Sequence, residues 1–213
     1  MIRIAISVEG PTEMEFCKKV LTPFFRNYNI EMIPVTICTS KDKCGRKSKG
    51  GSVNIDRIKN EVLKLLPSHD YVTTLYDFYG FSKRPTDDVN KLEQILFELF
   101  NDNRFIPYIQ QYEFETLLFS KPEYYEEYFG DGRVSEKMKK IIAEFQDDIE
   151  KINDSPQTAP SKRLEKLFNE VGEFYDKVFY GEGIAGDIGL ECMRKKANRF
   201  NEWVEKIIKL GNK

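Results

Sequence analysis

Short apolar runs alternate along the first half of the chain with segments whose apolar residues recur every three or four positions. The runs are rich in β-branched residues and predict buried strands, and the spaced segments predict helices. The predicted strands are 2–8, 30–38, 69–78 and 105–110. The predicted helices between them are 12–28, 54–66 and 87–100. Strands that alternate with helices indicate an α/β fold with a mainly parallel sheet covered by helices on both faces.

The second half of the chain has a different pattern, with no strand signal from Lys121 onward. Amphipathic spacing predicts three further helices, the last broken near Asn198. They are 135–152, 161–178 and 187–210. Polar residues at 153–160 and the glycine-rich stretch 180–187 predict connections between them. We therefore expect an α/β core over residues 1–120 and a C-terminal helical extension, residues 121–213, packed on it.

Composition narrows the class of protein. The chain has 213 residues, 40% of them hydrophobic, which is enough for a sizeable core. With a net charge of -2, the protein has no global positive field, so contact with nucleic acid would need a local basic patch. No apolar run is long enough to cross a bilayer and the N-terminus lacks signal-peptide character, so a cytoplasmic protein with no membrane contact is expected.

Cysteine and histidine are too scarce for several common chemistries. Four cysteines without a CxxC pair and a single histidine, His69, argue against a zinc finger or ribbon. Phosphate-loop, dinucleotide and serine-hydrolase motifs are also missing from the sequence. An enzyme of this composition must work with carboxylates, a metal ion or a lysine.

Carboxylates follow three of the predicted strands. Glu9 follows the first, Asp77 the third, and Glu113 with Glu115 the last. Because the carboxyl ends of parallel strands line one crevice, these acids are candidates for a shared Mg²⁺ or Mn²⁺ site. Each acid could instead have only a structural role. Asp77 could begin an Asx-turn. Glu113 and Glu115 share a strand face if the strand continues, but they become first-turn helix acids if it stops at Gln111.

The helix after the first strand has its own acid, Glu13. Thr12 and Glu15 fit a capping box, which predicts a helix start at Thr12 with Glu13 in its first turn. A first-turn acid suits the helix dipole, so Glu13 is a candidate metal ligand or a structural residue.

Two basic segments could bind an anionic polymer. Residues 41–51 carry five cations and three glycines, and a solvated loop or a nucleic-acid contact both fit them. Lys162 and Arg163 begin a predicted helix, where the dipole disfavours cations, which suggests an anion contact. The candidate nucleic-acid-binding residues are Lys41, Lys43, Arg46, Lys47, Lys49 and Arg163.

Several motifs together resemble a known family. They are "VEGPTE", "YDFYGF", "IPYIQQYEFETLLF", "PSKRLEKLF", "GIAGDIGL" and "RFNEWVEKI". The chain resembles the bacterial domain-of-unknown-function family 4276 over nearly its whole length, and its "EGPTE" start is similar to the Toprim domains of overcoming-lysogenization-defect nucleases, topoisomerases and primases.

The resemblance implies a Toprim-like core that binds one or two Mg²⁺ or Mn²⁺ ions and acts on phosphodiester bonds, often beside a partner ATPase in anti-phage or mobile-element loci. It implies that Glu9 serves as ligand or general acid/base, that Asp77 is a ligand, and that Glu113 or Glu115 is a later acid. Lys162 or Arg163 would then stabilise charge on the phosphate.

One position departs from the Toprim pattern. The usual second motif is Asp-x-Asp, whereas Tyr79 stands where its second acid would be. The expectation is therefore a divalent-metal-dependent nuclease, or a related phosphoryl-transfer enzyme, of a bacterial defence or mobile-element system. Its catalytic candidates are Glu9, Asp77, Glu113, Glu115 and Lys162, and its metal candidates are Glu9, Glu13, Asp77 and Glu113. The alternative is a catalytically degenerate module that binds a partner ATPase or nucleic acid without cutting it.

Overall fold

The protein consists of two compact units. The computed structural model describes residues 1–41, 47–49, 53–153 and 155–212. The first unit comprises Met1–Gln110 together with Ile207–Lys213, and the second comprises Gln111–Lys206. The C-terminal helix α10 (Asn198–Gly211) begins in the second unit and ends in the first.

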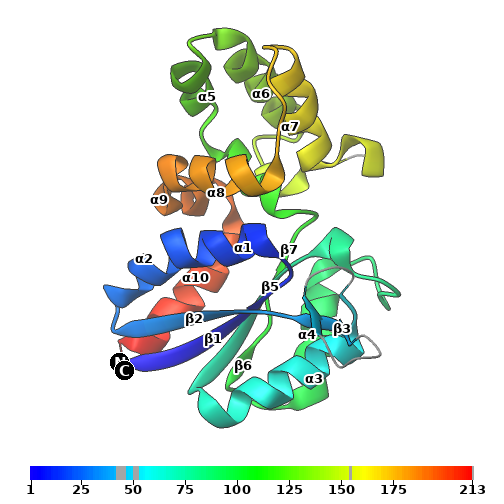
Figure 1. Ribbon diagram of the computed structural model, residues 1–213, viewed down its shortest axis with the longest axis vertical. Helices are drawn as coiled ribbons and strands as arrows, with labels where there is room; N and C mark the ends of the chain where they lie inside the picture. The colour runs from blue at the N-terminus through cyan, green and yellow to red at the C-terminus, as the bar shows by residue number, and fades with distance from the viewer. Residues whose placement is uncertain (42–46, 50–52, 154, 213) are drawn as a thin grey trace. The chain divides into compact units, whose positions relative to one another are not determined.

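A parallel sheet forms the centre of the first unit, as Figure 1 shows. Its strand order is β2-β1-β5-β6, with β7 also paired to β5, and every pair in it is parallel. The strands are β1 (Ile2–Val8), β2 (Ile30–Thr36), β5 (Tyr71–Asp77), β6 (Phe105–Ile106) and β7 (Ile109–Gln110). The predicted α/β fold with a mainly parallel sheet is confirmed.

The last predicted strand is split in two by its own sequence. Pro107 has no N–H to donate to the ladder, so pairing with β5 stops after Ile106 and resumes at Ile109. A threonine side chain fills the gap: the backbone N–H of Tyr108 donates to Thr74 Oγ1 at 2.9 Å, and this hydroxyl donates to the Tyr108 carbonyl at 2.8 Å. The side chain of Thr74 therefore keeps β7 in line with β5.

Helices cover both faces of this sheet (Figure 1). The first helix is continuous from α1 (Pro11–Phe16) through a π-helical turn (Cys17–Leu21) to α2 (Thr22–Arg26), and it lies on one face with the end of α10. On the other face lie α3 (Ile55–Leu65) and α4 (Val89–Phe100), and short 3-10 turns follow α3 at Leu66–Ser68 and β5 at Phe78–Gly80.

Within the first unit, the end of α10 packs very closely on the residues at the start of β2. A Cβ on Gly211 would lie 1.9 Å from the carbonyl oxygen of Tyr28 and 2.9 Å from Ile30 Cγ1, at the start of β2. Ile207 is fully buried in the last turns of this helix. Only a glycine allows the helix to pack so tightly on this edge of the sheet.

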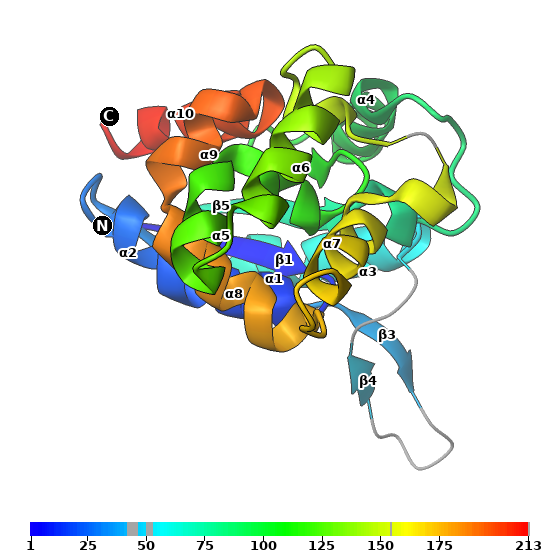
Figure 2. The ribbon, with the colours of Figure 1, turned by 90° about the horizontal axis from the view of Figure 1, so that it is seen from above.

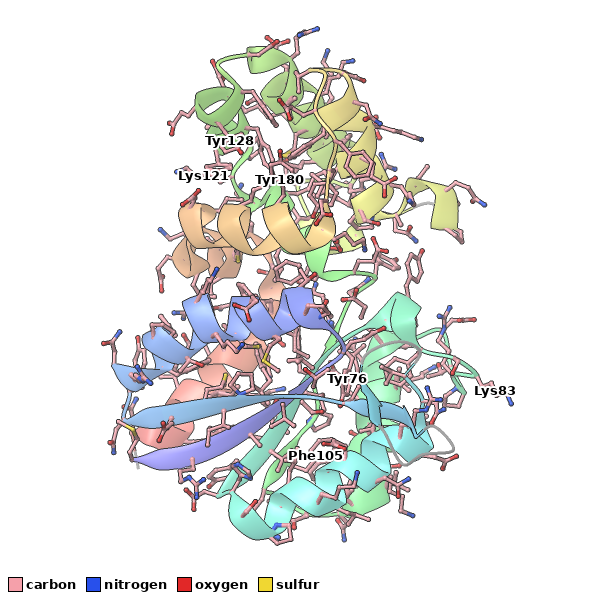
Figure 3. All side chains as sticks on the ribbon, in the orientation of Figure 1. Tyr76, Lys83, Phe105, Lys121, Tyr128 and Tyr180 are labelled. Carbon is pink, nitrogen blue, oxygen red and sulfur yellow. The ribbon has the colours of Figure 1, made fainter. Side chains whose placement is uncertain are left out.

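The described residues of the second unit form helices joined by turns and irregular segments, with no strand among them. Its α-helices besides the start of α10 are α5 (Pro122–Phe129), α6 (Gly132–Glu144), α7 (Pro160–Asn169), α8 (Lys177–Ile188) and α9 (Leu190–Lys196). Its 3-10 turns are Phe114–Ser120, Ile149–Lys151 and Pro156–Thr158. Aromatic rings join these helices; Tyr128 and Tyr180, for example, meet edge to face at 6.4 Å (Figure 3). Trp203 on α10 is buried, since it is 2% exposed.

Several predicted boundaries are wrong in this helical part. The predicted connection 180–187 lies inside α8, because Ile184, Ala185 and Ile188 are buried and their packing outweighs the low helix propensity of three glycines. The sequence pattern also missed α5. The predicted helices 135–152 and 161–178 end earlier, at Glu144 and Asn169, whereas the predicted break before Asn198 is confirmed at Ala197.

The basic stretch predicted as a loop contains two short strands. β3 (Cys38–Lys41) and β4 (Lys47–Lys49) form an antiparallel pair that extends away from the central sheet (Figure 2). The predicted nucleic-acid residues Lys41, Lys47 and Lys49 lie on this pair, and Lys43 and Arg46 lie outside the described residues.

Candidate metal and phosphate site

Two of the predicted acids lie at neighbouring strand ends. Glu9 directly follows β1, and Asp77 is the last residue of β5. The two strands are adjacent and parallel, with Val8 opposite Leu75, so their carboxyl ends are level. Both acids are partly exposed. The structure thus places Glu9 and Asp77 at neighbouring strand ends, at the same end of the sheet, and the Oε2 atom of Glu9 is itself buried.

The Glu9 carboxylate lies against the backbone of the turn after β5. A Cβ on Gly80 would be 2.2 Å from Glu9 Oε2 and 2.9 Å from Glu9 Cδ and Oε1. No side chain larger than hydrogen fits at that distance. Gly80, in "YDFYGF", therefore sets the position of the carboxylate, a role that sequence analysis missed.

Glu13 has a structural role at the helix start. Its Oε2 accepts a hydrogen bond of 2.9 Å from the Gly10 backbone N–H, and the residue is 8% exposed. The predicted start at Thr12 is wrong: the helix begins at Pro11 with Gly10 as N-cap, because the fixed φ of proline suits the first helical position. Glu15 instead pairs with Lys18 at 2.7 Å.

A buried polar group lies beneath the strand ends. The Tyr76 hydroxyl donates to Ser7 Oγ at 2.6 Å, inside the first unit (Figure 3). Burial raises the pKa of Tyr76, and the negative charges of Glu61 and Glu9 raise it further. Glu61 projects from α3 and is only 7% exposed, with Lys64 as its ion-pair partner at 3.1 Å. The helical pattern of 54–66 gave no sign that this acid faces inward.

Gln110 of β7 lies opposite Asp77 of β5 in the pairing of these two strands. Gln110 is fully buried and its Oε1 accepts a hydrogen bond of 2.9 Å from the Tyr108 hydroxyl, while its Nε2 has no hydrogen-bond partner among the residues that the structure describes. A buried amide donor beside the strand-end acids is a further polar group that sequence analysis missed.

The basic segment is anchored at both ends beside these acids. The Ile37 N–H donates to the Val8 carbonyl at 2.9 Å, one residue before Glu9. The Val53 N–H donates to the Gly80 carbonyl at 3.0 Å, at the glycine that contacts Glu9. Residues on either side of the basic segment are therefore hydrogen-bonded next to the candidate acids.

Glu113 and Glu115 belong to the second unit and both have protein partners. The strand stops at Gln110, so the helical alternative for these acids is the correct one: Glu113 precedes a 3-10 turn and Glu115 lies in it. Glu113 accepts a hydrogen bond of 2.9 Å from the Ser161 N–H at the start of α7. Lys177 Nζ lies 3.1 Å from Glu115 and 3.7 Å from Glu113.

The Glu115 carboxyl is almost fully enclosed, with 2% of its side chain exposed. Burial raises its pKa, and the Glu113 charge adds to this effect while Lys177 opposes it. Tyr175 is 3% exposed, its hydroxyl has no hydrogen-bond partner, and burial with the nearby Glu115 charge raises its pKa. The second unit thus has its own ionic cluster, in which the single charge of Lys177 offsets part of the negative charge of the two acids.

The two predicted phosphate contacts at the start of α7 differ in their surroundings. Lys162 is exposed and pairs with Glu165 at 2.7 Å. Arg163 is largely covered: its Nε donates to the Thr158 carbonyl at 2.8 Å, and its guanidinium lies over the Phe145 ring at 5.2 Å. Lys162 is thus held by a surface ion pair, whereas Arg163 is held by the backbone and by an aromatic ring.

Comparison with known proteins gives one finding. Residues 8–208 match the family described as "Domain of unknown function (DUF4276)". The chain belongs to this family. The match to DUF4276 covers both units and includes Glu9, Asp77, Glu113, Glu115 and Lys162. Curated proteins and solved structures give no significant match to the chain.

The donor atoms of this DUF4276 protein suit a hard divalent cation. Among the residues that the structure describes, no three His, Cys, Asp or Glu side chains are grouped to hold a metal ion. Mg²⁺, however, keeps several waters and is commonly held by one or two carboxylates together with substrate phosphates. Glu9 and Asp77 supply such a pair of carboxylates, so the chemistry of the donor set fits Mg²⁺ or Mn²⁺. In the described part of the chain no helix is long and apolar enough to span a membrane.

Proposed function

We propose that this DUF4276 protein is a divalent-metal-dependent nuclease of a bacterial defence or mobile-element system. The observation that carries the proposal is the position of Glu9, which is held against Gly80 beside Asp77 at the carboxyl ends of two adjacent parallel strands. Ligands of open parallel sheets bind at this edge. The similarity of "EGPTE" to Toprim nucleases points to the same residues.

Each residue has a role in this proposal. Glu9 and Asp77 hold the cation, and Gly80 fixes the direction in which Glu9 points. A bound Mg²⁺ or Mn²⁺ polarises the phosphate and stabilises the charge that develops on it. In the second unit, Lys162 carries an ammonium group that can stabilise charge on a phosphate. The lysines and the arginine of residues 41–51 attract the sugar-phosphate backbone toward the strand ends.

A second candidate function is a binding module without cleavage, which contacts nucleic acid or a partner ATPase. Tyr79 replaces the second acid of the Toprim motif, and the described residues contain no three-ligand group. Glu113 and Glu115, which would have to replace that acid, are engaged by Ser161 and Lys177. This candidate predicts nucleic-acid binding that does not depend on a metal ion.

The test compares the wild-type protein with Glu9→Gln and Asp77→Asn variants. Plasmid DNA, single-stranded DNA and tRNA are each incubated with Mg²⁺, Mn²⁺ or EDTA, and cleavage is followed on gels. Glu98→Gln is the matched control, because Glu98 is an exposed acid on α4 and its replacement also removes one charge.

We expect cleavage only with a metal ion, and we expect both variants to lose at least about 100-fold in rate while the control does not. Full activity in both Glu9→Gln and Asp77→Asn would refute the assignment of these residues. Absence of cleavage and of Mn²⁺ binding by calorimetry would favour the binding module.

A further inference from the structure

A groove between two helices of the second unit is lined by four basic residues. The groove has a volume of about 290 Å³, and its cations are Lys137 and Lys140 from α6 and Arg163 and Lys166 from α7. Glu144 and Glu170 also line it, and Ile141 and Leu167 supply apolar surface. Four cations against two carboxylates leave a local excess of two positive charges in a protein whose net charge is -2.

The excess resides on two particular lysines. Lys137 forms an ion pair with Glu170, and Arg163 Nη1 lies 3.9 Å from Glu144 Oε2. In the described part of the chain, no ion pair involves Lys140 or Lys166, and both are exposed. The two lysines with uncompensated charge therefore come from opposite walls of one groove.

The two helices that form the walls of the groove are held in place by buried contacts. Arg163 is 12% exposed in its side chain and is held by the Thr158 carbonyl and the Phe145 ring. Leu167 is 3% exposed, and Val134 and Met138 on α6 are fully buried, so both helices are fixed by apolar contacts. Lys140 and Lys166 can extend into the groove without any change in these contacts.

We propose that this groove binds the phosphates of a nucleic-acid strand, at a position other than the strand-end acids. Two uncompensated lysines on facing helices match the spaced negative charges of a phosphate backbone, and the apolar surface between them can contact sugars. The inference rests on the proposed function for the class of polymer, and it adds a second contact region that holds the strand without cutting it.

The test measures binding in the absence of cleavage. A fluorescein-labelled oligothymidylate is titrated with protein in EDTA, and anisotropy is recorded at several salt concentrations. The groove variant is Lys140→Ala with Lys166→Ala. The charge-matched control is Lys195→Ala with Lys206→Ala, because these lysines are exposed in the same unit and do not line the groove.

Counterion release fixes the expected size of the effect. Each lost phosphate contact makes the negative slope of log K against log [salt] shallower by about 0.7 for a single strand. Two lost contacts therefore change the slope by about 1.4, which corresponds to a roughly 25-fold loss of affinity at about 0.1 M salt. We expect this loss for the groove variant and less than about twofold for the control. A Lys140→Glu with Lys166→Glu variant should bind more weakly still, with an unchanged circular dichroism spectrum.

Equal affinity and equal salt slope for the groove variant and its control would overturn the inference. The binding assay in EDTA tests the groove separately from the proposed nuclease function, which the cleavage assay tests. Glu9→Gln should bind the oligonucleotide as the wild type does, but it should lose cleavage. If the wild type cleaves nucleic acid and the groove variant binds normally, the nuclease stands and the groove is not a phosphate site. A wild-type protein that does not bind the oligonucleotide in EDTA also overturns the groove proposal.

Discussion

The contact between Gly80 and Glu9 gives the sharpest prediction for the candidate site. In Gly80→Ala the new methyl group would lie 2.2 Å from Glu9 Oε2. An ordinary carbon–oxygen contact is about 3.4 Å, so the carboxylate must move by roughly 1 Å or more. Because the obstructing group is the end of a flexible side chain and not backbone, the side chain of Glu9 yields before the turn does.

The expected magnitudes follow from that displacement. Moving a catalytic group by about 1 Å can cost about 100-fold in rate, whereas modest overpacking costs about 1 kcal/mol in the free energy of unfolding. We therefore expect Gly80→Ala to lower the metal-dependent cleavage rate about 100-fold with only a small fall in Tm. Cleavage rates and thermal unfolding of the same preparation measure both quantities.

Two further variants make this reasoning refutable. Gly186→Ala is the control. Among the described residues, no atom outside the adjoining residues and the backbone of α8 itself lies within 4 Å of the position of its Cβ, and a helix favours alanine. The double variant Glu9→Gln with Gly80→Ala should be no slower than Glu9→Gln alone, since both changes remove one interaction. Normal cleavage by Gly80→Ala, or fully additive losses in the double variant, would show that the position of Glu9 does not matter for the reaction.

The second unit yields two predictions about stability. The raised pKa of Glu115 means that the folded state binds a proton more tightly than the unfolded chain, so its contribution to stability falls as pH rises from about 4.5 through the folded pKa. Glu115→Gln should remove this fall, and chemical denaturation at several pH values measures it; an unchanged pH profile would contradict the assignment. Glu113→Ala should cost about 1 kcal/mol in the free energy of unfolding, because the Ser161 N–H at the start of α7 loses its acceptor. Glu113→Gln should restore most of that loss, and equal stability of both Glu113 variants and the wild type would refute the capping role.

The alternation of strands and helices in the first unit was predictable because it depends on burial. Strands β1 and β5 are covered on both faces, so nearly all of their residues are buried, and α3 and α4 need only one apolar side. The position of Glu9 and Asp77 at strand ends followed from the same pattern. Local sequence was sufficient for these features because each depends on a few neighbouring residues.

Features that depend on distant packing were not predictable in the same way. The glycines of α8 resemble a turn until the burial of Ile184 and Ile188 is known. The contact between Gly80 and Glu9 depends on the register of two strands separated by more than sixty residues. The partners of Glu113 and Glu115 come from α7 and from Lys177, and no local pattern links these segments.

The division of the first unit between the two ends of the chain affects its synthesis. The last turns of α10 pack on Tyr28 and Ile30, yet they are translated after the whole of residues 111–206. At about 5–20 residues per second, ribosomes need roughly 5–20 s to make that intervening segment. During this interval the nascent α/β unit lacks the helix end that covers the start of β2. Its completion is therefore a late step that follows synthesis of the second unit.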